Sequence, residues 1–278
     1  MKGKSMAEMK YVELYSGQAL PVLGLGTWDI GGGTYADRSR DAQAKKALQS
    51  AIEIGYTHFD AAEIYGAGHT EELIGEVLAG YDRESFFITT KVNPGNLRYQ
   101  DVLRALEGSL KRLRMDYVDL YLIHWPSRQI PLEETFQALN QLVERGSVRH
   151  VGVSNFSLDL LKQSQALSGT PVVTNQVPYS VRDREYVRNG VLGYCQANGI
   201  LLTAYSPLKR GVLSDPAVRR VASRRGASPA QVALSWLLGQ PGVITIPKSS
   251  NRKRQEENYA ALALELTAEE MSALDQSA

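Results

Sequence analysis

Short apolar runs alternate with amphipathic stretches along the chain. Eight runs lie at residues 22–28, 56–60, 86–92, 118–124, 150–154, 172–176, 201–206 and 243–247. Several of them are continuous and rich in β-branched or aromatic residues, without regular alternation of polar positions. This pattern is typical of strands that are buried on both faces. The runs therefore predict eight buried strands.

The stretches between the runs predict helices. Apolar residues recur at helical spacing in residues 101–113, 132–146, 228–242 and 267–278. Gly146 stands where a left-handed C-terminal cap is expected. Ser228 and Thr267 stand at N-cap positions, and Pro229 occupies the first position of its helix.

The order of these elements predicts the fold. Strands that alternate with helices at a spacing of roughly 30 residues indicate an α/β protein, a (β/α)₈ TIM barrel, as one domain over residues 1–278. The competing architecture, a doubly wound sheet, normally carries G-x-G-x-x-G after its first strand. The sequence GLGTW at residues 24–28 breaks that fingerprint. Residues 11–22 predict a β-hairpin, with its turn at Ser16-Gly17, that closes the bottom of the barrel.

Composition and charge narrow the class of protein. Lys and Arg number 31 against 30 Asp and Glu, so a field that gathers nucleic acid or anionic membrane is not expected. No apolar run approaches the ~18 residues that span a bilayer, and the basic residues 1–10 lack the apolar stretch of a secretory signal. Cys195 is the only cysteine, which excludes an intramolecular disulfide and a multi-thiolate metal site. We expect a cytoplasmic globular protein.

Titratable residues end three consecutive runs. Asp60, Lys91 and His124 stand at or near the ends of the second, third and fourth runs, and Tyr65 follows Asp60 by five positions. Active sites of (β/α)₈ barrels lie at the carboxyl ends of the strands. Each residue alone is explained by a rim ion pair, a core histidine or an ordinary half-buried aromatic. Their coincidence favours a site for proton transfer.

The motifs that carry these residues resemble a known family. GLGTW, FDAAEIYG, TTK, LIHWP, VGVSNF, YSPL and IPKS followed by R-x-x-E-N are similar, in this order, to the aldo-keto reductases. The resemblance covers most of the chain. It implies a (β/α)₈ barrel that binds NAD(P)H in extended form. It also implies that Asp60, Tyr65, Lys91 and His124 are the family's catalytic tetrad.

The implied tetrad has a physical rationale. Carbonyl reduction needs a hydride on carbon and a proton on oxygen, and an unperturbed tyrosine with a pKa of about 10 is a sluggish acid. We expect the Lys91 ammonium to lower the pKa of Tyr65, and Asp60 to keep Lys91 charged. A neutral His124 donates a hydrogen bond to the carbonyl oxygen. Tyr65 is then the proton donor.

The resemblance also implies a cofactor, NADPH, with NADH bound more weakly and with no metal. Lys248, Ser249 and Arg254 are expected to hold the 2′-phosphate, and Glu257 and Asn258 the adenine. The full implied set is Gly26, Thr27, Trp28, Asp60, Ser154, Asn155, Gln176, Tyr205, Ser206, Pro207, Leu208, Lys248, Ser249, Ser250, Asn251, Arg254, Glu257 and Asn258.

Within that set, three groups serve the reacting half of the cofactor. Ser154, Asn155 and Gln176 correspond to the family's carboxamide-binding residues, Tyr205 to the residue that stacks on the nicotinamide, and residues 206–208 to the pyrophosphate path. Lys209-Arg210-Gly211 departs from the small residues of many relatives, and whether its two cations face the pyrophosphate or water is left open. Residues 219–225 are expected to form a solvated helix face.

These observations predict an NADPH-dependent oxidoreductase that reduces aldehydes or ketones. Two alternatives are a lyase in which Lys91 forms a Schiff base, and a non-catalytic cofactor-sensing subunit. Trp28, Tyr65, His124 and Trp125 are expected to wall the substrate pocket. The connection after His124 is short and the last helical pattern reaches Ala278, so we expect no lid, an open pocket and broad specificity. We also expect a monomer whose partner is a small carbonyl compound.

Overall fold

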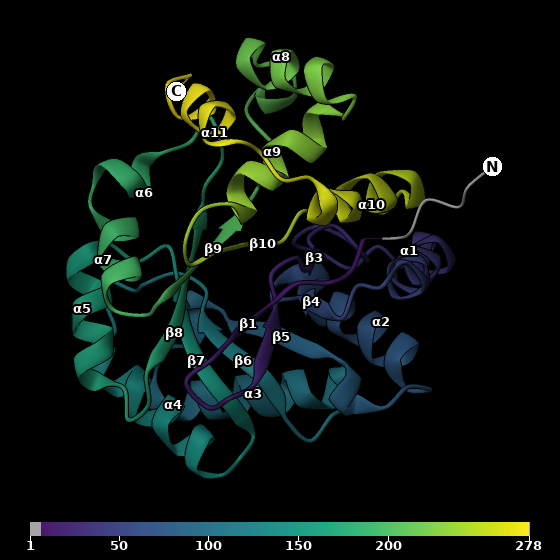
Figure 1. Ribbon diagram of the computed structural model, residues 1–278. Coiled ribbons are helices and arrows are strands. Elements are labelled where there is room, and N and C mark those ends of the chain that lie inside the picture. The colour runs from purple at the N-terminus through teal and green to yellow at the C-terminus, as the bar shows by residue number, and fades with distance from the viewer. Residues whose placement is uncertain (1–6, 278) are drawn as a thin grey trace.

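Eight parallel strands form the centre of the computed structural model, which describes residues 7–277 (Figure 1). In spatial order they are β3 (Leu25–Gly26), β4 (His58–Asp60), β5 (Phe87–Val92), β6 (Val118–Ile123), β7 (Val148–Ser154), β8 (Val172–Pro178), β9 (Leu201–Tyr205) and β10 (Val243–Thr245). Leu23 pairs with Thr245 and Gly26 with Lys248, which closes the circle between β10 and β3. The (β/α)₈ prediction is confirmed, and the doubly wound alternative is wrong.

Helices surround the strands on the outside (Figure 1). They are α1 (Asp41–Ile54), α2 (His69–Leu78), α3 (Tyr99–Leu113), α4 (Leu132–Glu144), α5 (Leu158–Leu167), α6 (Glu185–Arg188), α7 (Val191–Ala197), α8 (Pro216–Arg225), α9 (Pro229–Leu238), α10 (Arg252–Tyr259) and α11 (Ala268–Asp275). Short 3₁₀ helices occur at η1 (Arg38–Arg40), η2 (Tyr65–Gly68), η3 (Arg83–Ser85), η4 (Pro94–Asn96), η5 (Val212–Ser214) and η6 (Ala260–Ala263).

The predicted helix caps are confirmed, although α9 and α11 end at Leu238 and Asp275, before the ends of their predicted ranges. Gly146 has a φ of 73°, the left-handed conformation expected after α4. Ser228 caps α9 in a reciprocal pair with Gln231, and Thr267 caps α11 in the same way with Glu270. In both pairs the hydroxyl and the longer side chain satisfy backbone N–H groups that the first helical turn leaves free.

Two predictions differ from the structure. The first apolar run, residues 22–28, forms regular strand only at Leu25–Gly26, and before it Leu23 makes a single isolated bridge to Thr245 of β10. Residues 219–225 belong to α8 and are not only a solvated face, because Val221 and Ala222 are buried against the core. A helix that is charged on one side still needs an apolar side to attach it to the barrel.

The hairpin closes the bottom of the barrel, as predicted. β1 (Tyr11–Glu13) and β2 (Ala19–Pro21) pair antiparallel around Gly17, whose φ is 82°. Figure 1 shows this purple hairpin crossing the strands. Leu14 and Leu20 pack against barrel-interior residues such as Leu120, so the lower core is apolar and filled.

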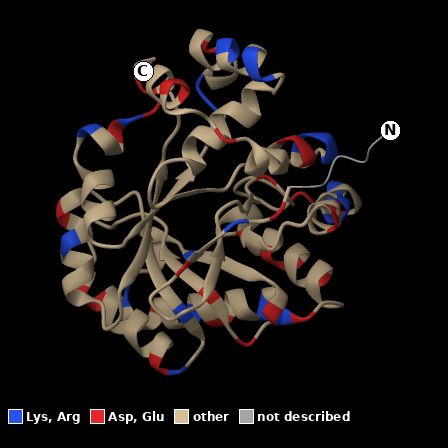
Figure 2. Cartoon of the chain, in the orientation of Figure 1, with Lys and Arg blue, Asp and Glu red and all other residues tan. Residues whose placement is uncertain are grey.

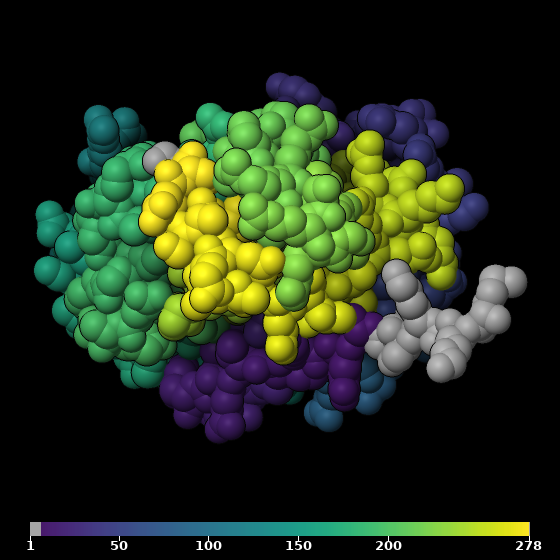
Figure 3. Space-filling view, turned by 45° about the horizontal axis from the view of Figure 1, so that its top comes forward, coloured from purple at the N-terminus to yellow at the C-terminus, as the bar shows by residue number. Residues whose placement is uncertain are grey.

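The surface carries charges of both signs. Figure 2 shows Lys and Arg interspersed with Asp and Glu around the helices. One ion pair, Lys10–Glu265 at 3.8 Å, joins the N-terminal and C-terminal segments, which adjoin in Figure 3 as purple and yellow atoms. None of the described helices has the length and apolar character needed to cross a membrane. The expectation that residues 1–10 are not a secretory signal involves residues 1–6, and the expected end of the last helix involves residue 278. These residues lie outside the described residues.

Candidate active site

A cavity of about 490 Å³ lies at the carboxyl ends of the strands. Its lining follows all eight strands around the barrel, as the fold predicts for an active site. The predicted site residues that line it are Gly26, Thr27, Trp28, Asp60, Tyr65, His124, Trp125, Ser154, Asn155, Gln176, Tyr205, Ser206, Pro207, Leu208 and Lys248. The structure therefore brings together most of the residues that the sequence singled out.

The centre of the cavity wall is a buried hydrogen-bonded cluster. Lys91 Nζ, on β5, donates to Asp60 Oδ1 on β4 at 2.6 Å and to the carbonyl oxygen of Ala61 at 2.7 Å. The same ammonium lies 3.3 Å from the Tyr65 hydroxyl. Gln176 Nε2 donates to the second oxygen of Asp60 at 2.7 Å. Lys91 is fully buried, so its position is determined from every side.

Burial and neighbouring charges set the ionisation of this cluster. Burial by itself lowers the pKa of Lys91, but the charge of Asp60 opposes it and holds that pKa above its ordinary value. Burial raises the pKa of Tyr65, and the nearby Lys91 ammonium only partly offsets that effect. Lys91 therefore lowers the pKa of Tyr65, as expected, but burial outweighs its effect and the pKa lies above its ordinary value. Tyr65 carries its proton here and can donate it.

His124 is neutral, as the expected mechanism requires. Burial, with a smaller contribution from Lys91, lowers the pKa of His124 to about 3. The ring packs edge-on to Tyr65, with centroids 5.7 Å apart. Its Nδ1 has no hydrogen-bond partner within the described part of the chain. That nitrogen is itself buried and does not face open space.

Asn155 connects three of the predicted site residues. Its amide nitrogen donates to the carbonyl oxygen of His124 at 3.1 Å and to Ser154 Oγ at 2.9 Å, and its oxygen accepts from Tyr205 at 2.8 Å. Its φ of 64° is left-handed, a conformation that asparagine adopts more readily than most residues. These bonds occupy both amide hydrogens, so Asn155 supports its neighbours in addition to facing the cavity.

Apolar residues wall the rest of the cavity. Trp28 and Trp125 are 39% and 48% exposed, and Trp28 packs edge-on to Tyr65 with centroids 5.0 Å apart. Sequence reasoning missed four apolar lining residues: Ile64, Pro94, Ile246 and Pro247. Each follows a strand by only a few positions, so the same rule that selected Asp60 and His124 could have found them.

The segment after β10 forms the far rim. Lys248 lines the main cavity, and with Ser250 it also lines a second cavity of about 60 Å³ beside Asp29 and Arg40. Lys248 Nζ lies 3.6 Å from Asp29 Oδ2. Lys248 thus stands between the main cavity and the loop that follows β3.

The remaining predicted cofactor residues lie at or along α10. Ser249 Oγ accepts from Asn251 N at 3.1 Å, and Asn251 caps α10 by accepting from Arg254 N at 3.2 Å. Arg254 is exposed, Glu257 half-buried and Asn258 buried. Ser249, Asn251, Arg254, Glu257 and Asn258 are outside the lining of the main cavity.

Gln255 is a supporting residue that sequence reasoning missed. It is fully buried; Ser50 Oγ donates to it at 2.8 Å, and its own amide donates to the carbonyl oxygens of Ala47 and Ser249, each at 2.9 Å. These bonds tie the turn before α10 to α1. In sequence it is one polar residue among many in a charged helix, so no local signal identified it.

The sequence left open whether Lys209 and Arg210 face the pyrophosphate or water, and the structure places the two residues differently. Lys209 lines the main cavity. Arg210 has a left-handed φ of 55° and pairs with Asp183 at 2.7 Å. Arg210 therefore links its turn to the loop that carries Asp183.

Comparison with known proteins places the chain in a family. The model of the Aldo/keto reductase family matches residues 22–278. "Methylglyoxal reductase YeaE" of Escherichia coli is 36% identical over 97% of this chain and 95% of its own length. "Glyoxal reductase" of Bacillus subtilis is 37% identical over 95% of this chain and 91% of its own length.

Solved structures of similar proteins support the same family. The thermostable aldo-keto reductase Tm1743, crystallised with the inhibitor epalrestat, is 48% identical with a TM-score of 0.95, over 97% of this chain and 100% of its own. An aldo/keto reductase from Klebsiella pneumoniae with NADP and acetate is 34% identical with a TM-score of 0.86, over 97% and 95%. The chain belongs to the aldo/keto reductase family. It is an NADP-dependent oxidoreductase that acts on carbonyl groups.

Proposed function

We propose that this enzyme reduces a broad range of aldehydes and ketones to alcohols, with Tyr65 as the proton donor. The observation that carries the proposal is the contact between the Lys91 ammonium and the Tyr65 hydroxyl beside a neutral His124. Tyr65 and His124 both line the cavity, whereas Lys91 is buried behind it. Substrate in the cavity can therefore contact Tyr65 and His124 but not Lys91.

The cavity fits the reacting half of NADPH. Its volume of about 490 Å³ is within the range of small-molecule sites, and its lining runs from Tyr65 to Lys248. Bound NADPH supplies the hydride. We assign Ser154, Asn155 and Gln176 to its carboxamide, the Tyr205 ring to stacking, and residues 206–208 to its pyrophosphate. Gly26, Thr27, Trp28 and Asp60 complete the wall of that half.

The chain's own residues handle the proton. His124 and Tyr65 orient the carbonyl oxygen by hydrogen bonds, and Tyr65 then transfers its proton to that oxygen. The resulting tyrosinate is stabilised by the ammonium 3.3 Å away, while Asp60 keeps that ammonium charged and in place. The raised pKa of Tyr65 keeps its hydroxyl protonated until the proton is transferred to the carbonyl oxygen of the substrate.

The segment at α10 fits the adenosine end. We assign Lys248, Ser249 and Arg254 to the 2′-phosphate, because two cations beside a helix N-terminus favour a dianion. Among residues 7–277, Arg254 has no carboxylate within ion-pairing distance, so its charge is available. Ser250 and Asn251 shape the turn, and Glu257 and Asn258 are assigned to the adenine. NADH lacks the 2′-phosphate and should bind more weakly.

We further propose short dicarbonyl and aromatic aldehydes as substrates. Relatives are named for methylglyoxal and glyoxal, and the tryptophan walls suit flat or small carbonyl compounds. Apolar walls discriminate by only ~1–3 kcal/mol per methylene-sized difference, which favours broad specificity. We expect the enzyme to act in the cytoplasm as a monomer, without a membrane or nucleic-acid partner.

A substrate panel tests the proposal. NADPH oxidation is followed by absorbance with methylglyoxal, glyoxal, benzaldehyde derivatives and aliphatic aldehydes. Several compounds should be turned over, with kcat/KM values within ~10⁴ of each other. One compound above all others by more than that factor would contradict broad specificity. Substrate trapped on Lys91 by borohydride would instead support a lyase, and NADPH binding without any turnover a cofactor-sensing role.

A further inference from the structure

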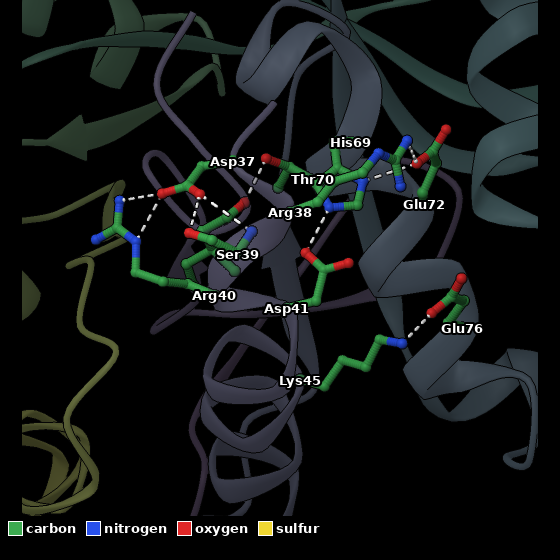
Figure 4. Close-up of polar contacts among 11 residues, drawn as sticks. Asp37, Arg38, Ser39, Arg40, Asp41, Lys45, His69, Thr70, Glu72 and Glu76 are labelled. Atoms are coloured by element: carbon green, nitrogen blue, oxygen red, sulfur yellow. Dashed lines mark hydrogen bonds and ion pairs between the residues drawn. The ribbon is translucent and has the colours of Figure 1, made fainter. Parts of the chain in front are cut away.

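A buried histidine joins two helices next to Tyr65. His69 is the first residue of α2, four positions after Tyr65, and it is 3% exposed. Its Nδ1 lies 2.7 Å from Glu72 Oε2 on the same helix, and its Nε2 lies 2.7 Å from Asp41 Oδ1 at the start of α1. Figure 4 shows the ring between these two carboxylates.

The geometry determines the protonation of the ring. Ionised carboxylates only accept hydrogen bonds, so a ring nitrogen at 2.7 Å from such an oxygen must carry a hydrogen. Both nitrogens meet this condition, so His69 is an imidazolium. Arg38 adds a second cation, with Nη2 2.9 Å from Glu72 Oε2, which balances the two carboxylates. The pKa of Glu72 is lowered, first of all by its hydrogen bond with His69.

The turn that carries Tyr65 needs support from outside. Gly66, Ala67 and Gly68 have φ angles of 56°, 51° and 93°, all left-handed. An alanine in this region is strained by roughly 1 kcal/mol or more, and such strain persists only where surrounding structure imposes it. The turn therefore does not hold Tyr65 by its own preference.

The support comes from the loop that follows Trp28. Gly66 N donates to the carbonyl oxygen of Gly33 at 2.6 Å, and Thr70 Oγ1 donates to that of Ile30 at 2.6 Å. Gly31 packs so closely against His69 and Leu73 that a Cβ there would lie 3.2 Å from His69 Cδ2 and 2.7 Å from Leu73 Cδ1. His69 thus lies where the Tyr65 turn, the loop after Trp28 and the start of α1 meet.

We propose that the His69 imidazolium is a positioning residue for carbonyl reduction. By binding Asp41 and Glu72 together it fixes the start of α2 on α1, and so fixes Tyr65 relative to Lys91 and to Trp28. A shift of about 1 Å at a reacting group costs up to about 10²-fold in rate. This inference rests on the proposed role of Tyr65.

A control pair lies one turn further along the same two helices. Lys45 Nζ on α1 lies 2.5 Å from Glu76 Oε2 on α2, also drawn in Figure 4, but both side chains are at least a third exposed. An exposed ion pair contributes little to stability. Lys45→Met therefore removes a link between α1 and α2 without touching the buried one.

The test uses His69→Gln, Asp41→Asn and the double variant. In His69→Gln the Asp41 carboxylate loses the one cation that it contacts among residues 7–277, whereas Glu72 keeps Arg38, so we expect kcat to fall about tenfold while the Kd for NADPH changes less than about twofold. Adding Asp41→Asn removes the unpaired charge, and kcat should recover to within about threefold of the parent enzyme. Lys45→Met should stay within about twofold.

Nitrogen-15 NMR of the unsubstituted enzyme provides a readout that does not depend on activity. Both ring nitrogens of His69 should be protonated at neutral pH. One unprotonated nitrogen would overturn the inference, as would unchanged kcat in His69→Gln or no recovery in the double variant. An enzyme with no carbonyl reduction at all would refute the proposed function, and the NMR spectrum would still decide the state of His69.

Discussion

Both ends of the barrel contain an aspartate, a cation and a tyrosine in contact. The upper trio is Asp60, Lys91 and Tyr65, and the lower trio is Asp119, Arg83 and Tyr117. Asp60 and Asp119 are each 1% exposed. Lys91 Nζ lies 2.6 Å from Asp60, and Arg83 Nη2 lies 2.5 Å from Asp119. By residue type and burial of the aspartate the two trios are closely similar.

They differ in how the cation meets the tyrosine. Lys91 lies over the ring of Tyr65, 4.9 Å from its centroid, but it also lies 3.3 Å from the hydroxyl oxygen, where it can stabilise a tyrosinate. The Arg83 guanidinium lies over the ring of Tyr117 at 4.1 Å from its centroid, and Arg149 stacks on the same ring at 4.0 Å. A cation that contacts only the face of the ring stabilises the packing of the tyrosine but does not assist a proton transfer from its hydroxyl. A buried aspartate–cation pair therefore marks an active site only where the cation reaches an ionisable atom beside open space.

Replacing Asp119, the carboxylate of the lower trio, should have the largest effect of all these changes. The effect is on stability. Asp119 also accepts from Gln18 Nε2 at 2.7 Å and from Ile88 N at 2.9 Å, so Asp119→Ala leaves several buried donors without an acceptor. We expect the free energy of unfolding to fall by about 3–5 kcal/mol. Urea unfolding measures this change. The kcat of the folded fraction should be unchanged, and a matching loss of kcat would show that the lower trio is coupled to catalysis.

Removing the upper hydroxyl should have the largest effect on rate. Tyr65→Phe keeps the ring but removes the proton donor, so kcat should fall by at least about 10²-fold while NADPH still binds. Lys91→Met should be comparably severe. Steady-state kinetics and cofactor fluorescence titration provide the two measurements. Turnover retained in Tyr65→Phe would remove Tyr65 from the mechanism.

Tyr117→Phe is the matched control at the lower end. The Tyr117 hydroxyl has no hydrogen-bond partner within residues 7–277, so its removal leaves no donor or acceptor unpaired. We expect kcat to stay within about twofold and stability within about 0.5 kcal/mol. Equal losses of kcat in the two Tyr→Phe variants would mean that the phenylalanine change acts through packing at both ends.

The upper end also has a cation, Arg254, that pairs with no carboxylate among residues 7–277. If it holds the 2′-phosphate, Arg254→Ala should weaken NADPH binding by roughly 1.5–3 kcal/mol and leave NADH binding nearly unchanged. Isothermal titration with both cofactors measures the difference. Equal losses for the two would place Arg254 at a part of the cofactor that they share.

The smallest effect on kcat is expected from a change of pH. Burial lowers the pKa of His124 at the upper end to about 3 and that of His150 at the lower end to about 4. Both are therefore neutral in the folded enzyme above about pH 5, and neither His124 nor His150 should give kcat a limb between pH 6 and 8. An unfolded histidine binds a proton below its ordinary pKa of about 6.5, so these two sites reduce stability as pH falls from there towards the folded values. A kcat limb near pH 6.5 that disappears in His124→Gln would contradict this.

Local sequence determined the elements and the catalytic centre. Helical spacing and cap residues such as Ser228 and Thr267 act within one turn of the chain, and the apolar runs record burial on both faces of a strand. The strand-end rule and the family motifs then selected Asp60, Tyr65, Lys91 and His124, because the carboxyl ends of parallel strands meet at one rim. These signals need only neighbours in sequence.

Only the tertiary structure decided the rest. The raised pKa of Tyr65 depends on how deeply the packed barrel buries it, and no spacing along the chain records that depth. Gln255 bonds to α1 about two hundred positions away, and Arg210 to Asp183 on another loop. His69 looks like an ordinary polar residue at a helix start, and its charge follows from a carboxylate that α1 brings to 2.7 Å. Such contacts depend on how distant segments pack, because hydrogen bonds and desolvation act through space.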